Sequence, residues 1–411
     1  MQSLKELFKI GNGPSSSHTM GPKRATEIFK NKNLDADYFK VILYGSLALT
    51  GKGHLTDYII KKTLEGYKVD IEFDYKTKCD VHPNTFDIFA YKDGELLNNW
   101  RVYSVGGGTF KIEGKKDIDH PDIYKEECFG DIKKVCEEKN IDLYEYVKSV
   151  EGDDIDEFLK EIWESMQNTI EEGLSKEGMI HGKLKLERRA KSILEKSVPD
   201  ETFDLRQTRL LSAYAYATNE ENATGGIMVT APTCGASGVL PAVLYYMKKE
   251  YIVEDDLIIK SLAVAGIIGN VVKRNASISG AECGCQAEVG TACSMAAAAC
   301  SYIKGLNIEK IENSAEIAME HHLGLTCDPI FGYVQIPCIE RNAVAAMRAI
   351  DATKLAMLTS KQRKISFDVV VETMYETGKD LQSHYRETSE GGLAKKYCRN
   401  KYYNIDMKED E

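Results

Sequence analysis

A short segment near the N-terminus, GNGPSSSHTMGP, gathers four hydroxyl side chains and one imidazole between stretches of Gly and Pro. It spans residues 11–22, and its polar members are Ser15, Ser16, Ser17, His18 and Thr19. One helix N-cap needs only one side-chain oxygen, so four hydroxyls exceed what capping requires. The surplus favours a site for an anion or a carboxylate, in which His18 donates a hydrogen bond or moves a proton. Simple capping of the helix that follows is the alternative.

Cysteines supply the second candidate chemistry. The chain has 411 residues and eleven cysteines, and most of them fall in its second half: Cys234, Cys283, Cys285, Cys293, Cys300, Cys327, Cys338 and Cys398. We expect no secretory signal at the charged N-terminus, so metal binding or catalysis explains the thiols better than a disulfide framework does. No C-x-x-C pair occurs, which argues against a zinc knuckle, and ferredoxin-type runs are also absent.

Four of the cysteines lie at three predicted helix ends. Cys283 and Cys285 share a Gly-rich turn, and Cys327 and Cys338 stand next to prolines, eleven residues apart. Free backbone N–H groups at helix ends support thiolate charge. Convergence of these junctions would create a metal or cluster pocket. Packing is the alternative, because free Cys behaves as a small buried hydrophobe, and we expect it for the pair in the Ala-rich segment 291–303.

A third polar loop follows the strand-like segment GIMVTAP. It reads TCGASG, and it offers Thr233, Gly235 and Ser237 in front of a predicted helix. Backbone N–H groups and hydroxyls in such a loop bind a carboxylate or a phosphate. The Gly-Lys-Ser/Thr ending of a P-loop is missing. A tight junction between helices is the alternative.

The elements that must position these loops fall into two regions. KVILYGSLAL, YKVDIEFDY and FDIFAYKDGELLNNWRVYSV, within residues 40–110, alternate like half-buried strands, and Asp93-Gly94 predicts a hairpin. Residues 54–66 show helical spacing between the first two strands. From about residue 120 the period of the pattern changes, and apolar residues recur at helical spacing through most of the rest of the chain. We therefore predict an α+β protein: a small N-terminal α/β-sandwich domain, residues 1–150, followed by an all-α helical catalytic domain, residues 151–411.

The composition and the net charge limit the kinds of partner that we expect for this chain. The chain is 43% hydrophobic and 28% charged, as in an ordinary globular protein, and its formal net charge is −11. That charge argues against a nucleic-acid partner, because no basic stripe is present. The most apolar stretch, residues 257–272, contains Lys260 and Asn270 and falls short of a membrane span. We expect a cytoplasmic protein with no membrane partner.

Long blocks of the sequence resemble a known family. GPSSSHTMGP, YSVGGG, NATGGIMVTAPTCGASGVLPA, SGAECGCQAEVG and CDPIFGYVQIPCIERNA occur in this order over nearly the whole chain. Together they resemble the iron–sulfur-dependent L-serine dehydratases (L-serine ammonia-lyases) of the single-chain bacterial type. The resemblance implies conversion of L-serine to pyruvate and ammonia in a homodimer.

The resemblance also implies a cofactor and roles for the loops. The cofactor is a [4Fe–4S] cluster held by Cys285, Cys327 and Cys338, with one open iron that acts as a Lewis acid on the substrate hydroxyl. Cys285 is chosen over Cys283 on the family pattern alone. The hydroxyls of residues 15–17 and 19 and the loop at 233–237 would bind the substrate. His18 is the first candidate for the base and Glu282 the second.

Other functions remain open at this point. L-threonine deamination and L-cysteine desulfidation are alternative reactions on the same scaffold. One sequence does not reveal which residues line the pocket and so select among L-serine, L-threonine and L-cysteine. A pyridoxal-phosphate enzyme is disfavoured, because no convincing Schiff-base lysine stands beside a phosphate loop. A non-catalytic iron–sulfur redox sensor belongs to another class. The two anion-ready loops argue against it, because a sensor needs no substrate site.

Single cysteine variants test the ligand assignment. Cys327→Ala or Cys338→Ala is expected to abolish cluster assembly, because each removes one of three thiolates. Cys300→Ala is the matched control and is expected to leave the iron content unchanged. The measurement is iron and sulfide per chain after anaerobic purification. Normal iron content in either of the first two variants would refute the assignment.

Overall fold

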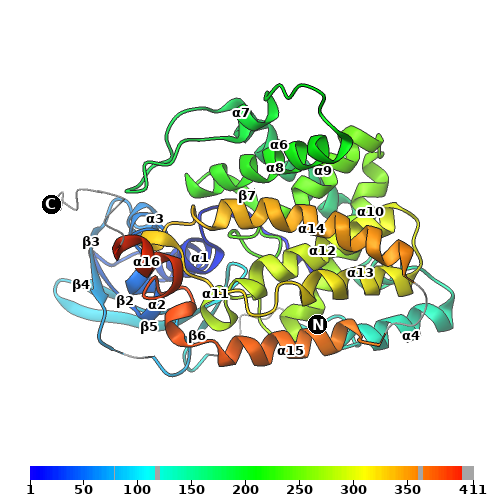
Figure 1. Ribbon diagram of the computed structural model, residues 1–411. Helices are drawn as coiled ribbons and strands as arrows, with labels where there is room; N and C mark the ends of the chain where they lie inside the picture. The colour runs from blue at the N-terminus through cyan, green and yellow to red at the C-terminus, as the bar shows by residue number, and fades with distance from the viewer. Residues whose placement is uncertain (78, 116–120, 360–363, 400–411) are drawn as a thin grey trace.

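The computed structural model describes residues 1–77, 79–115, 121–359 and 364–399, so the charged C-terminal tail lies outside the described residues. It contains a small sheet domain followed by a helical domain, as the sequence predicts (Figure 1). The sheet is made of β2 (Tyr38–Tyr44), β3 (Lys68–Asp74), β4 (Thr85–Lys92), β5 (Glu95–Gly106) and β6 (Thr109–Ile112). Its strand order is β3-β2-β4-β5-β6, in which β2 and β3 are parallel and the other neighbours antiparallel. The predicted hairpin is confirmed, with Asp93 and Gly94 both at positive φ between β4 and β5.

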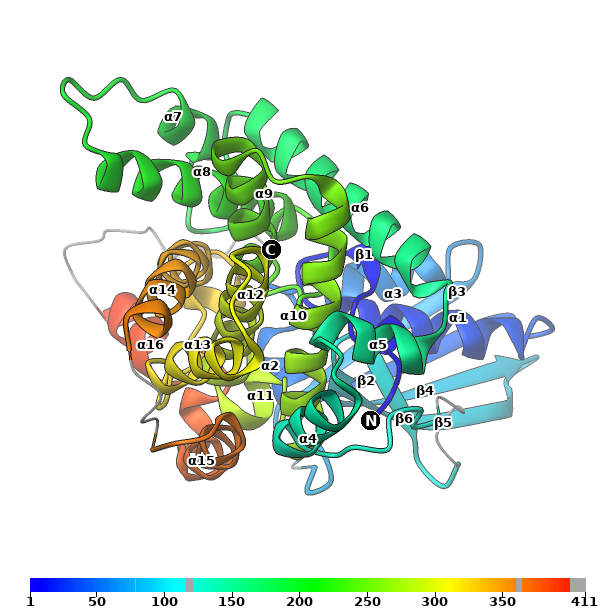
Figure 2. The ribbon, with the colours of Figure 1, turned by 90° about the vertical axis from the view of Figure 1, so that its right-hand side faces the viewer.

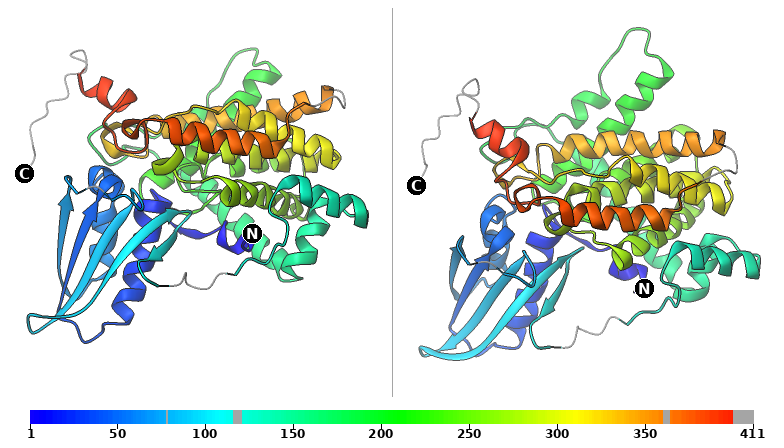
Figure 3. Two further views of the ribbon diagram at one scale, coloured as in Figure 1. Left: turned by 90° about the horizontal axis from the view of Figure 1, so that it is seen from below. Right: turned by 60° about the horizontal axis from the view of Figure 1, so that its bottom comes forward.

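One face of the sheet packs against helices α1 (Gly21–Asn31) and α3 (Thr56–Thr63) (Figure 3). Alternate residues of the strands, such as Phe39 and Ile88, point into this core, where Phe29 of α1 contacts Trp100 edge to face. The prediction that the first strand continues through GSLAL is wrong. Gly45 takes a φ of 51°, and the chain turns there into the short helix α2 (Gly45–Thr50).

The helical domain is a bundle around one buried helix. Its helices are α4 (Phe129–Lys139), α5 (Leu143–Glu151), α6 (Ile155–Ser175), α7 (Ala190–Leu194), α8 (Phe203–Ala223), α9 (Val239–Tyr251), α10 (Asp255–Asn275), α11 (Gly280–Cys283), α12 (Thr291–Ile303), α13 (Ile308–Glu320), α14 (Cys338–Leu358), α15 (Phe367–Asp380) and α16 (Gly392–Arg399). Helix α12 lies between α10, α13 and α14 (Figure 2). Its run of alanines lets these neighbours approach closely on every side, which explains why it is apolar all round.

The N-terminal segment joins the two domains. Short helix η1 (Leu4–Glu6) buries Leu4, Leu7 and Phe8 in the helical core, and β1 (Ile10–Asn12) pairs with β7 (Ile227–Val229). The chain then enters the sheet domain, so residues 13–19 lie where the domains meet. The predicted burial of the GNGPSSSHT loop against the helical bundle is confirmed.

The domain limit at residue 150 stays a prediction. Phe129 of α4 and Leu143 of α5, which precede it, pack in the helical core. Within the residues that the structure describes, no helix is long and apolar enough to cross a membrane.

Candidate active site

The hydroxyl loop forms one tight turn that leads into α1. Ser15 accepts a hydrogen bond from the His18 backbone N–H (3.1 Å) and so caps the π-type turn η2 (Ser16–Met20). The side chain of Ser104, on β5, donates to the Ser17 carbonyl oxygen (2.6 Å). From the helical domain, Asn222 donates to the Pro14 carbonyl oxygen (2.9 Å). Both domains therefore fix the loop, and residues 15–19 are all buried.

The hydrogen bonds around His18 define its tautomer. The hydroxyls of Ser46 and Thr50 both donate to carbonyl oxygens, so each can only accept from His18 Nε2, at 3.1 and 3.0 Å. Nε2 therefore carries the proton, and Nδ1 is the acceptor that faces the Ser17 hydroxyl at 2.9 Å. Burial lowers the pKa of His18 to about 4, so the ring is neutral at neutral pH and Nδ1 is free to take a proton.

A second histidine and a carboxylate complete this half of the site. The His54 ring stacks on His18 with 4.3 Å between centroids, and its Nδ1 is 3.0 Å from the Thr50 carbonyl oxygen. One carboxylate oxygen of Glu387 lies 3.7 Å from His18 Nδ1 and 3.5 Å from His54 Nε2. A proton that reaches either nitrogen would thus be stabilised by the same carboxylate. Burial opposes the charge on Glu387, but interactions with His18 and His54 lower the pKa of the carboxyl group. The His18 part of this effect is coulombic and requires the protonated ring, so the hydrogen bond with His54 is the one that supports the carboxylate while His18 is neutral.

Three cysteines lie close enough to interact with one another, and two of them, Cys327 and Cys338, also interact electrostatically with Glu387. The Cys285 and Cys327 thiols are hydrogen-bonded to each other, which lowers the pKa of Cys285 to about 7 and raises that of Cys327. Cys338, at the first turn of α14, interacts electrostatically with Cys285. The Glu387 backbone N–H donates to the Cys327 carbonyl oxygen (2.8 Å), so the thiol group and the histidine pair share one segment of chain.

Arg341 supplies the positive charge beside the thiols. It lies one turn along α14 from Cys338 and donates to the Thr326 carbonyl oxygen (2.6 Å) and to Asp328 (3.2 Å). Its guanidinium contributes to the lowered pKa of Cys285, after the Cys327 hydrogen bond. The cation therefore favours the thiolate form that metals require.

These thiols are compatible with a metal cluster. All three are free, and in the described part of the chain they do not form a group within 4.8 Å of one another. The tight group that does exist is His18, His54 and Glu387. We interpret it as proton-handling, because both His18 nitrogens already have hydroxyl partners.

The loop after β7 also reaches the thiol group. The Thr233 hydroxyl donates to Glu288 (2.8 Å), and a Cβ added at Gly235 would lie 3.4 Å from the same carboxylate oxygen. A Cβ at Gly280 would lie 2.6 Å from Glu288 and 3.2 Å from the Cys327 sulfur, so this carboxyl group is next to the thiols. Burial raises the pKa of Glu288 well above its usual value, which favours the protonated form of the carboxyl group.

Two of the predicted site residues, Ser237 and Glu282, have hydrogen-bond partners outside the group formed by the histidines and the three cysteines. The Ser237 hydroxyl donates to the Cys234 carbonyl oxygen (2.7 Å) and so closes its own loop. The Glu282 carboxylate accepts from Ser277 (2.5 Å) and lines a cavity between the domains. Within the described residues, Glu282 has no side-chain bond to the hydroxyl loop. Their assigned roles stay predictions.

Sequence reasoning missed His54, Glu288, Glu387 and Arg341. A weak signal existed for two of them. Glu288 is a lone acid in the Gly- and Ala-rich stretch GCQAEVG, and Glu387 stands in the polar segment ETSEGG, between two helices. His54 had no signal, because one histidine ahead of an amphipathic helix is ordinary.

Comparisons with known proteins identify the relatives of this chain. Family models of the serine dehydratase beta chain and alpha chain match residues 3–70 and 87–394. The chain is 40% identical to L-serine dehydratase 2 of Escherichia coli (strain K12), over 96% of this chain and 99% of that protein. It is 40% identical to an L-serine dehydratase of Haemophilus influenzae, over 96% and 99% of the two chains. For that of Streptomyces coelicolor the identity is 38%, over 95% and 98%.

The fold and the matches define a two-domain protein in which a beta-chain region and an alpha-chain region are fused. The chain belongs to the serine dehydratase family.

Buried neutral His18 makes stability depend on pH. Its folded pKa of about 4 lies below the ordinary 6.5, so the unfolded state binds more protons between these values. Stability is therefore lost as pH falls below 6.5, by up to about 1.4 kcal/mol per pH unit. His18→Asn is expected to flatten the fall in Tm between pH 6.5 and about pH 5.

The exposed residue His321 provides the matched control, and His321→Gln should keep the wild-type slope. The measurement is anaerobic thermal unfolding of the three proteins across this pH range. A wild-type slope in His18→Asn would show that His18 is not held neutral.

Proposed function

We propose that the protein is an L-serine ammonia-lyase that converts L-serine to pyruvate and ammonia. The observation that carries the proposal is Glu387, whose side chain contacts two histidines while its backbone is bonded to Cys327. One buried residue thus links a group that can handle protons to a group that can hold a metal cofactor. The names of the relatives, all L-serine dehydratases, support the same reaction.

The proposed cofactor is a [4Fe–4S] cluster bound by Cys285, Cys327 and Cys338. Three thiolates leave one iron of such a cluster without a protein ligand, and the cluster then supplies Lewis-acid assistance to the departure of the substrate hydroxyl. Arg341 offsets part of the thiolate charge in this buried place.

The chain's own residues supply binding. We propose that the hydroxyls of Ser15, Ser16, Ser17 and Thr19 bind the substrate carboxylate, at the point where α1 begins. In the structure three of these groups already have partners: the Ser15 and Ser17 hydroxyls are 3.3 Å apart within the loop, and the Thr19 hydroxyl donates to the His54 carbonyl oxygen outside it (2.8 Å). A loop held by both domains needs little reorganisation when it exchanges such bonds for a carboxylate.

Proton transfer falls to His18 and its neighbours. We propose that His18 accepts the Cα proton at Nδ1, and that Glu387 stabilises the imidazolium that forms. His54 Nε2, which faces the same carboxylate oxygen, is a second acceptor within reach. We propose Glu288, whose pKa is raised by burial, as the donor of the proton that turns the departing hydroxyl into water.

The test is an activity measurement on anaerobically purified protein. Cluster-loaded enzyme is expected to release pyruvate from L-serine, and exposure to air should remove activity in step with iron and sulfide. Product release from L-threonine and from L-cysteine, measured in parallel, decides substrate preference. Full activity in an iron-free sample that contains pyridoxal phosphate would refute the cluster. A loaded protein inactive on all three amino acids would favour a redox sensor.

A further inference from the structure

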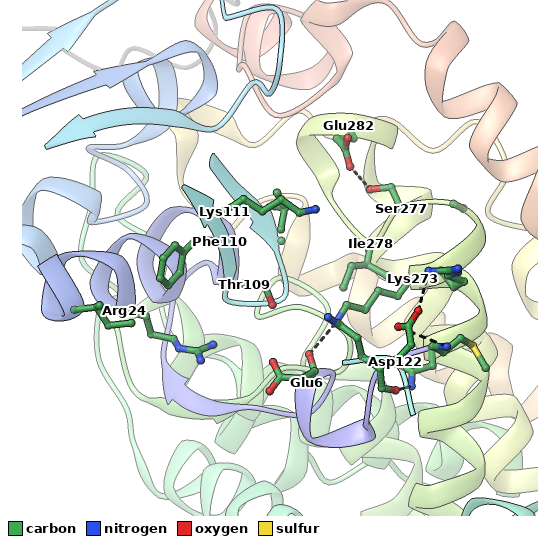
Figure 4. Close-up of a pocket in the computed structure, with 18 residues that line it drawn as sticks. Glu6, Arg24, Thr109, Phe110, Lys111, Asp122, Lys273, Ser277, Ile278 and Glu282 are labelled. Atoms are coloured by element: carbon green, nitrogen blue, oxygen red, sulfur yellow. Dashed lines mark hydrogen bonds and ion pairs between the residues drawn. The ribbon is translucent and has the colours of Figure 1, made fainter. Parts of the chain in front are cut away.

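A cavity of about 530 Å³ lies between the sheet domain and the helical domain. Its walls include Arg24 of α1, Thr109 and Lys111 of β6, and Lys273 of α10. Figure 4 shows the Arg24 and Lys273 side chains extending toward the same space from opposite walls. The histidine pair and the three cysteines do not line it.

The carboxylates around the cavity are already compensated. Asp122 lies 3.6 Å from the Met1 ammonium and 3.2 Å from Arg274. Glu6 is paired with Lys9 at 3.0 Å, and Glu282 accepts a hydrogen bond from a serine. These acids therefore have closer partners than the two cations that face each other, and Glu6 and Asp122 act on Lys273 at longer range.

Among the described residues, the hydrogen bonds of Arg24 and Lys273 go to neutral oxygens. Arg24 donates to the Gly108 carbonyl oxygen (2.9 Å), and Lys273 donates to the Gln2 side chain and to the Glu6 carbonyl oxygen, both at 3.0 Å. In the part of the chain that the structure describes, neither cation lies within 4 Å of a carboxylate. Burial lowers the pKa of Lys273 to about 8, so its ammonium is largely charged at neutral pH.

We propose that this cavity is a regulatory site for a small anionic metabolite that carries a phosphate group or several carboxylates. The anion lies between Arg24 of one domain and Lys273 of the other, and it bonds to both cations. The cavity volume suits a molecule of metabolite size. Regulation by this site rests on the proposed function, whereas binding does not.

The walls of the cavity continue directly into the active site. Arg24 follows the η2 turn by four residues, and Val105, which lines the cavity, follows Ser104, whose hydroxyl holds the Ser17 carbonyl oxygen. On the helical side, Glu282 precedes Cys285 by three residues. An anion that draws the two walls together would shift the hydroxyl loop relative to the thiols. We infer that its binding changes the affinity for the substrate.

Isothermal titration calorimetry at low ionic strength tests binding, with inorganic phosphate and citrate as probes. Wild-type protein is expected to bind at least one of them saturably, at one site per chain. Binding of phosphate alone assigns a phosphate-bearing ligand, and binding of citrate alone a polycarboxylate. Lys273→Met and Arg24→Met are expected to weaken binding about tenfold or more, which is the loss of one charged hydrogen bond.

Lys23→Met is the matched control, because Lys23 precedes Arg24 on α1 and does not line the cavity. It should bind as the wild type does. Circular dichroism confirms that each variant is folded. The absence of saturable binding of both probes, or unchanged binding in both cavity variants, would overturn the proposal.

Kinetics test the regulation separately. A saturating probe anion is expected to change the apparent KM for L-serine of the wild type by about threefold or more, and to leave that of Lys273→Met unchanged. An anion that binds without any change in KM would overturn the regulatory role. Absence of turnover from L-serine in every sample would refute the proposed function instead, and the calorimetric result would still decide whether the cavity binds anions.

Discussion

A carboxylate buried among imidazoles is the interaction on which the rest of the site depends. Glu387 is 5% exposed, and an isolated charge in such a place is expensive. His54 offsets part of that cost through its hydrogen bond, and a proton on His18 would offset more. Both histidines lie in the N-terminal part of the chain, so they do this only when the sheet domain is in place. The Glu387 backbone is paired with Cys327, so the cysteine segment must be in place as well. Docking of the domains and assembly of the site are therefore one event.

This constraint explains why the functional residues are far apart in the sequence. The hydroxyl loop and Cys285, the first of the three cysteines of the site, are separated by more than two hundred residues, and neither group forms a site alone. The N-terminal segment runs through the helical core and then into the sheet domain, and so fixes the loop from both sides. The cavity between Arg24 and Lys273 lies on the same domain boundary. The proposed active site and the cavity therefore share one boundary, and a ligand bound in the cavity would act on the residues of the site.

Much of the fold was predictable from local pattern. Periodic segments such as 155–175 and 255–275 form the expected helices, because only a helix places their regularly spaced apolar residues on the face that is buried. The alternation of GSLAL predicts a strand, but the positive φ of Gly45 turns the chain into the short helix α2 instead. The polar loops were recognisable because their hydroxyls and thiols exceed local structural needs. His54, Glu288 and Glu387 were not, because their roles arise from contacts across the two domains, which no local window contains.

The central claim is that the N-terminal hydroxyl loop and the three cysteines form one substrate site. The most direct test is electron paramagnetic resonance of the reduced cluster during titration with L-serine. The account predicts that L-serine changes the wild-type spectrum, and that Ser17→Ala needs at least about tenfold more L-serine for the same change. Ser192→Ala, at an exposed position, should titrate as the wild type does. A spectrum that does not respond to L-serine, or an unchanged titration in Ser17→Ala, would contradict the account.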